Sequence, residues 1–136
     1  MSDTQQLEVV DAATRQIVAT RELLTKPIPR RREFVELPEL GDNVGVWIRE
    51  WTPRERSEFE DQFTDRTGKP LPRMQKQYRE RLVVEVVRDA DDNRLLTAAD
   101  VEALGNQAGG VIERIVNAAM TVCRIRSSDL ESLAGN

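Results

Sequence analysis

The segment from Gly110 to Arg126 constrains the fold most, because its apolar residues keep the helical repeat along its whole length. The apolar positions are Val111, Ile112, Ile115, Val116, Ala119, Val122 and Cys123. An apolar stripe this broad is typical of a helix packed into a core rather than one lying on a surface. The rest of the chain therefore has to supply the surfaces that cover this helix.

Capping residues and helix breakers predict shorter helices around it. Thr52-Pro-Arg-Glu55 is a capping box with proline at the first helical position, and it predicts a helix that ends near Phe63. Residues 73–88 contain no glycine or proline, and we predict a single helix there. The β-branched stretch at 82–87 is the alternative, because such residues also favour a strand.

The C-terminal part contains two more capping boxes. Thr97 with Asp100 predicts a helix that Gly105 ends. The second box, Ser128-Asp-Leu-Glu131, predicts a short last helix. Cys123 lies on the apolar side of the long helix, so we expect it to be a buried structural residue.

A β-hairpin is predicted before these helices. Residues 33–37 and 44–49 alternate polar and apolar side chains, and turn formers fill positions 38–43. An isolated hairpin is only marginally stable, so it should pack on the helices, while its free edges could accept a strand from a partner. The predicted fold is mainly α (α+β): a small bundle of about four to five helices with one N-terminal hairpin.

We divide the chain into an arm, residues 1–32, and one hairpin-plus-bundle domain, residues 33–136. The arm contains good helix formers in residues 11–24, which predict either a short helix or a segment that orders on binding. Its end, residues 26–32, combines two prolines with four cationic residues. We interpret it as a solvated linker, with a small phosphate- or acid-binding patch as the alternative.

Composition argues against most catalytic classes. The chain has no histidine and a single cysteine, so it lacks intramolecular disulfides, thiolate metal clusters and the usual histidine-based catalytic sets. The formal net charge of −4 disfavours general nucleic-acid binding. No apolar run reaches the length of about 18 residues that a membrane helix needs. We therefore expect a binding protein, not an enzyme, with no cofactor.

The hairpin and its flanks provide the candidate partner-binding residues. These are Phe34, Val35, Leu37, Leu40, Trp47 and Trp51. Aromatic side chains dominate binding hot spots, which favours Trp47 as a partner contact if it points outward. The favoured interpretation is that Trp47 and Trp51 instead fill the space between the hairpin and the helices.

Residues 89–100 offer a different function. Asp89, Asp91, Asn93 and Asp100 occupy positions 1, 3, 5 and 12 of an EF-hand-like loop, and Ca²⁺ is bound by such oxygen ligands. Position 6, where the loop needs glycine, is Arg94, and position 12 carries aspartate in place of glutamate. A polar turn without a metal is therefore favoured, and a small helical regulator that binds calcium or another ligand is the alternative.

The order of these motifs resembles the phage tail assembly chaperone family. Residues 35–49, VELPELGDNVGVWIR, resemble the family's strand, Pro-Glu-Trp-Gly-like turn and second strand ending near an arginine. Residues 51–60 are similar to its first helix, and residues 89–104 to its Asp-rich turn and following helix. The likeness covers about residues 20–136, with departures at Leu40, where the family often has tryptophan, and at Arg94, where glycine is usual.

The resemblance implies a function. Such chaperones coat the tape-measure protein, a long helical chain that sets tail length, and keep it soluble until tail-tube subunits polymerise around it. Many are also made as a longer form by ribosomal frameshifting, and the extension recruits the tail-tube (major tail) protein. The end at Gly135-Asn136 fits the short, non-frameshifted form. We expect homo-oligomers along the tape measure, a location in the host cytoplasm and absence from the mature virion.

Overall fold

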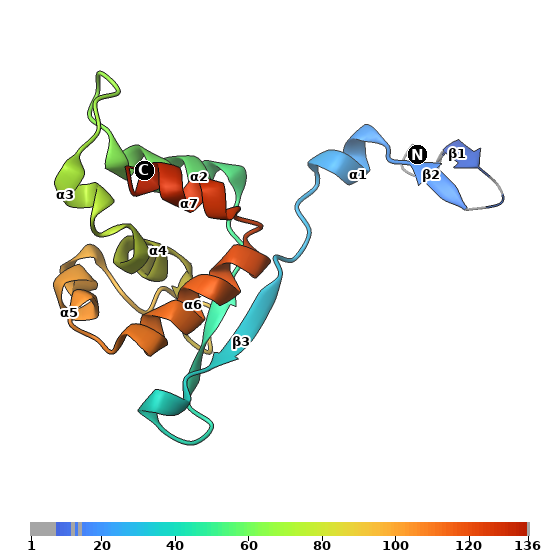
Figure 1. The fold of residues 1–136 in the computed structure, drawn as a ribbon. Helices are drawn as coiled ribbons and strands as arrows, with labels where there is room; N and C mark the ends of the chain where they lie inside the picture. Colours follow the sequence, from blue (N-terminus) through green and yellow to red (C-terminus); the bar gives the residue numbers. More distant parts are fainter. Residues whose placement is uncertain (1–7, 12, 14, 136) are drawn as a thin grey trace.

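A computed structural model of the chain describes residues 8–11, 13 and 15–135. Helices pack on one side of a small antiparallel sheet, and an arm extends away from this body (Figure 1). The architecture confirms the predicted α+β fold with a hairpin ahead of the helices.

The sheet has three strands, in the order β3-β4-β5. The predicted hairpin is confirmed as β3 (Arg32–Glu36) and β4 (Gly45–Arg49), joined through the 3-10 turn η2 (Pro38–Leu40). The third strand, β5 (Val87–Arg88), pairs with the other side of β4. The lone hairpin is therefore stabilised both by helices and by an extra strand.

The single helix predicted over residues 73–88 is wrong. The chain forms α3 (Pro72–Gln75), breaks, and forms α4 (Tyr78–Val86) before entering β5. The hydrogen bond from the Gln77 N–H to the Met74 carbonyl closes α3 with a tight turn. At Val87 the backbone becomes extended because the unpaired side of β4 offers hydrogen bonds and the core buries the side chain. The 82–87 strand alternative is thus correct only at its last residue.

Two of the predicted capping boxes are confirmed. Thr52 and Glu55 cap α2 (Pro53–Glu60), which continues through η3 (Asp61–Phe63) to the predicted end. Thr97 and Asp100 cap η4 (Ala98–Asp100), which leads into α5 (Val101–Gly105).

The third capping box is wrong in register. The last helix, α7 (Ser127–Leu133), begins one residue before Ser128, and the Asp129 carboxylate accepts from the Arg126 N–H at 3.0 Å. The left-handed backbone at Arg124, with φ of 55°, turns the chain sharply after the preceding helix and sets this start.

The core is built on α6 (Gly109–Val122), which packs against β3, β4 and α4. All seven positions of the predicted apolar stripe are buried, as are Phe59 and Phe63. Cys123 is buried as expected, and burial raises the pKa of its thiol to about 11. None of the helices in the described residues is long and apolar enough to cross a membrane.

The arm differs in part from its prediction. Its strands β1 (Glu8–Asp11) and β2 (Gln16–Val18) form a small antiparallel ladder, and among the arm residues that the structure describes only α1 (Arg21–Thr25) is helical. The described residues within 11–24 thus divide between a strand pair and a helix. In Figure 1 the arm joins β3 at the start of the strand and projects away from the helices of the body. The first seven residues and positions 12 and 14 of the predicted arm lie outside the described residues.

Gly45 provides a test of the sheet. A Cβ atom there would lie 2.8 Å from the Phe34 ring and closer still to the Val35 carbonyl oxygen. We expect Gly45→Ala to lower the free energy of unfolding by about 1–3 kcal/mol, as overpacking does. Gly109→Ala is the control, because its Cβ would meet open space. This variant should raise the free energy of unfolding by about 0.4–1 kcal/mol. Urea denaturation measures both, and equal stability of the two variants would contradict the packing.

Candidate binding surface

The sheet has one covered face and one open face. Val35, Val46 and Ile48 face the helices and pack in or against the core. Because side chains alternate along a strand, Phe34 and Trp47 point to the opposite face. We call this opposite side of β3 and β4 the outer face.

An aromatic pair with a stacked arginine occupies the outer face. The Phe34 and Trp47 rings meet edge to face with centroids 5.4 Å apart, and the Arg32 guanidinium carbon lies 4.3 Å from the Trp47 ring centroid. Phe34 keeps 43% of its surface exposed. The absence of a side chain at Gly45 leaves room for the Phe34 ring. Exposed aromatic and arginine side chains together are typical of binding anchors.

An ion-pair network fixes this face relative to the rest of the domain. Asp92, from the turn after β5, contacts Arg49 at 2.9 Å and Arg32 at 3.8 Å. Glu55, at the start of α2, contacts Arg30 at 2.5 Å and Arg49 at 3.7 Å. The network thereby joins the linker before β3, the sheet, the turn after β5 and α2.

Arg88 lies deeper on the same side and is only 2% exposed. Its guanidinium donates to the carbonyl oxygens of Glu85 at 2.7 Å and Val87 at 3.0 Å. Burial, together with the charges of Arg49 and Arg94, lowers the pKa of Arg88. The guanidinium thus serves to hold the turn from α4 into β5 and is not part of the open surface.

The six predicted partner-binding residues occupy three kinds of position. Phe34 and Leu40 are exposed, and Trp47 is half-buried on the outer face. Val35 and Trp51 pack against the core, where the Trp51 ring lies 5.5 Å from the Phe59 ring. The space-filling interpretation is therefore right for Trp51.

Leu37 is a correction. It is only 1% exposed and belongs to the core, so it has no surface to offer a partner. The cause is the strand alternation, which carries the inward-facing positions of β3 one residue past the end of the strand.

The calcium-loop residues are occupied by protein contacts. The Asp89 Oδ1 atom accepts from the backbone N–H groups of Asp91 at 2.8 Å and Asn93 at 3.0 Å. The Asp100 carboxylate accepts a hydrogen bond from the Thr97 N–H at 2.8 Å, and the Arg94 guanidinium forms an ion pair with the Glu85 carboxylate at 2.7 Å. Over the ranges that the structure describes, no three acidic or thiol side chains are grouped so that they could hold a metal ion.

Sequence reasoning missed two features of this surface. One is Asp92, whose partner Arg49 lies 43 residues away in the sequence, so no local pattern could pair them. The other is a set of exposed apolar side chains in the arm: Ile17, Val18, Leu23, Leu24 and Ile28. The signal for the second was present, because Leu23 and Leu24 are adjacent and cannot both face one side of a short helix.

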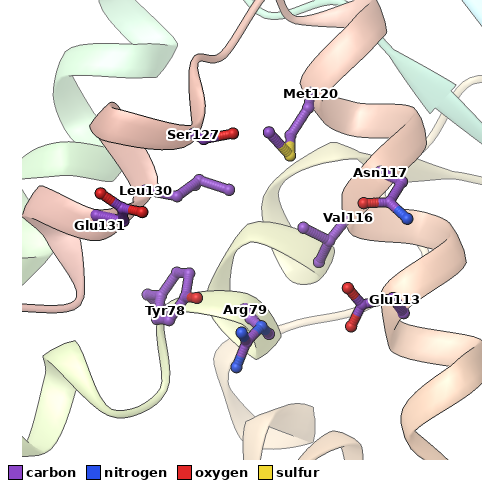
Figure 2. A pocket seen from close by; sticks show the side chains of 9 residues that line it. All are labelled: Tyr78, Arg79, Glu113, Val116, Asn117, Met120, Ser127, Leu130 and Glu131. Carbon is purple, nitrogen blue, oxygen red and sulfur yellow. The ribbon is translucent and has the colours of Figure 1, made fainter.

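A groove of about 350 Å³ lies between α4, α6 and α7. In Figure 2 the side chains of Val116, Met120 and Leu130 converge on it, while Arg79 and Glu113 lie at one side. It also receives Tyr78, Asn117, Ser127 and Glu131. Its volume and its apolar floor suit one or two apolar side chains of a partner helix.

Comparison with known protein families and with solved structures finds tail assembly chaperones in both cases. A family model described as "Phage tail assembly chaperone" matches residues 19–132, which includes α1 but not β1 or β2. Among solved structures, the bacteriophage HK97 tail assembly chaperone superposes with a TM-score of 0.50 and 18% sequence identity, over 75% of this chain and 90% of that chain. At this identity the likeness is one of fold. No curated protein matches the sequence.

Glu55 tests the ion-pair network. Burial raises its pKa, but the hydrogen bond from the Thr52 N–H and the charges of Arg30, Arg49 and Arg88 outweigh burial, so the net pKa is lowered. A lowered pKa stabilises the fold above the pKa of the unfolded chain, and this contribution disappears as the pH falls through the folded-state value. We expect Glu55→Gln to cost about 1–2 kcal/mol at neutral pH.

The matched control is Glu58→Gln, an exposed position on the same helix. Chemical denaturation at several pH values measures the difference between each variant and the wild type. The Glu55 difference should shrink in acid while the Glu58 difference stays near zero. A Glu55→Gln protein as stable as the wild type at neutral pH would contradict the network.

Proposed function

The chain belongs to the phage tail assembly chaperone family, and we propose that it coats the tape-measure protein of a phage or prophage tail and keeps it soluble until tail-tube subunits assemble. Membership of the family implies a role performed by binding, without chemistry. The partner class implied by the family is a phage tail protein, and the tape measure is the partner we propose.

The aromatic pair on the outer face is the observation that supports this proposal. A tape measure is a long helical protein whose apolar stripes would aggregate if left bare. Phe34, Trp47 and the stacked Arg32 offer such a stripe an apolar contact beside a positive charge. We propose that the partner helix lies across this face and contacts Phe34, Leu40 and Trp47, while Val35 and Trp51 support the contact from behind.

The arm is proposed to complete the contact. Leu24 is 81% exposed and Ile28 is 78% exposed, which is unusual for large apolar residues without a partner. Residues 15–32 also carry six cationic side chains against one acidic one. Such a segment can fold along an apolar helix that has acidic flanks. In this division residues 1–32 act as a binding arm and residues 33–136 as the folded domain.

The remaining parts of the proposal concern assembly. Many copies along one tape measure would bind with modest affinity each and high avidity together. Modest affinity per copy also lets polymerising tail-tube subunits displace them. A longer, frameshifted form would recruit the tail-tube protein. The chain would act in the host cytoplasm and be absent from the mature virion.

Trp47→Ala tests the proposed surface. We expect the variant to bind the tape measure at least about tenfold more weakly, as hot-spot truncations do. Its thermal midpoint should stay near that of the wild type, because Trp47 is only half-buried. The measurement is co-expression with the tape measure of the same gene cluster, followed by its soluble yield and its co-purification with tagged chain.

Two further variants make the result specific. Trp51→Ala removes a ring packed on Phe59 and should lower the thermal midpoint, which separates loss of fold from loss of contact. Asn117→Trp fills the groove of Figure 2 and should leave binding unchanged. If Asn117→Trp abolishes binding and Trp47→Ala does not, the partner lies in the groove and the proposed surface is wrong. Failure of the wild type to solubilise or retain the tape measure would overturn the function itself.

A further inference from the structure

The free edge of β3 is an unpaired strand edge. Across the described residues, β3 pairs with β4 on one side and with no strand on the other (Figure 1). The Leu37 N–H donates to the Val44 carbonyl at 2.7 Å, and the Glu50 N–H donates to the Arg31 carbonyl at 2.9 Å. Residues with odd numbers therefore bond to β4, and Arg32, Phe34 and Glu36 direct their backbone groups to the free edge.

This edge lacks two common protections. β3 contains no proline, and its pairing with β4 runs over five consecutive residue pairs without a bulge. An edge strand without proline or a bulge can serve as a template for another strand. Its side chains on the outer face decide which strand it fits.

Those side chains are complementary to their own sequence read backwards. Along the outer face the order is Arg32, Phe34 and Glu36, that is, cation, aromatic ring and carboxylate at every second position. An antiparallel copy presents the same series in reverse. With Phe34 opposite Phe34, each Arg32 lies opposite a Glu36, so both ends of the pair carry an opposite-charge contact.

We propose that two copies of the chain pair antiparallel through β3, about a two-fold axis at Phe34, to form one continuous six-stranded sheet. The partner this edge fits is thus a second copy of the same chain.

The backbone agrees with this register. The residues that face the free edge are 32, 34 and 36, and the register places 34 opposite 34 and 32 opposite 36 as hydrogen-bonded pairs. The same residues carry the complementary side chains. A shift by one residue would set backbone groups that point toward β4 against the partner and would move Phe34 off the axis. Backbone and side chains therefore select one register.

The pairing also brings exposed apolar groups outside the strand close to one another. Ile28 is 78% exposed in the linker before β3, and Leu40 is 50% exposed in the turn after it. In an antiparallel pair the linker of one copy runs toward the turn of the other, which brings Ile28 near the Leu40 turn. On the outer face the two aromatic pairs become one row, with Phe34 of each copy at the centre and Trp47 on each flank.

A charge exchange tests the pairing on the purified chain. We expect the wild type to pass from monomer to dimer between about 1 µM and about 1 mM, as measured by light scattering and sedimentation equilibrium. Glu36→Arg or Arg32→Glu alone sets like charges opposite each other at both ends, so the dimer dissociation constant should rise about tenfold or more. The double variant Arg32→Glu with Glu36→Arg restores opposite charges and should return it toward the wild-type value.

The control for these variants is Glu58→Arg, which makes the same charge change on exposed α2 and should leave the dissociation constant unchanged. Circular dichroism confirms that each variant remains folded. A wild type that stays monomeric over the whole concentration range overturns the proposal. So does a dimer on which the single and double exchanges act alike.

A cysteine scan tests the register. Phe34→Cys places two thiols across the axis at the spacing of a hydrogen-bonded pair, about 5.5 Å between Cα atoms, which is within disulfide range. We expect this variant to form a covalent dimer in mild oxidant. Glu36→Cys lies opposite Arg32 of the second copy and should not. The native Cys123 should not compete, because it is buried and its pKa is raised to about 11.

Equal cross-linking of the two cysteine variants would overturn the Phe34-centred register. The proposal does not rest on the proposed function, since every measurement uses the purified chain without a tail protein. If both hold, the paired sheets offer the tape measure a surface twice as wide, and the Glu36→Arg variant should also lose avidity in the co-purification assay.

Discussion

Burial of the apolar stripe of α6 is the constraint on which the rest of the structure depends. The helix is apolar on one broad side, and it is covered by β3 and β4 together with α4. Because the hairpin must lie flat against the helix, Val35, Val46 and Ile48 point inward. The alternation of side chains then leaves the opposite face of the hairpin open.

The open face explains why a small acidic domain displays aromatic rings and arginines side by side. Its position is set by carboxylates from elsewhere in the chain, Glu55 at the start of α2 and Asp92 in the turn after β5. Both carboxylates contact Arg49, and Glu55 also contacts Arg30 in the linker before β3. A surface fixed in this way can meet a partner without reorganising, which reduces the entropy lost on binding.

The same arrangement leaves β3 at the edge of its sheet and the arm beside it. The partner that we propose is a long helical protein, and a chaperone that binds along such a protein gains from presenting more than one binding surface. Pairing of β3 with its own copy would place two such surfaces side by side in one dimer. The groove between α4, α6 and α7 lies among the helices that close the core, and its charged rim distinguishes it from the aromatic outer face.

The sequence by itself determined the features that depend on local interactions: the apolar stripe of α6, the caps at Thr52 and Thr97, and the two strands of the hairpin. It also indicated the family, because the order and spacing of these motifs match the family although no single motif is a strong signature. Tertiary structure alone decided that the chain leaves α4 for β5 at Val87, that Leu37 is core while Phe34 is surface, and that Asp92 holds Arg49. Each of these depends on a partner far away in the sequence, and a hydrogen bond or ion pair between distant segments leaves no local periodicity to read.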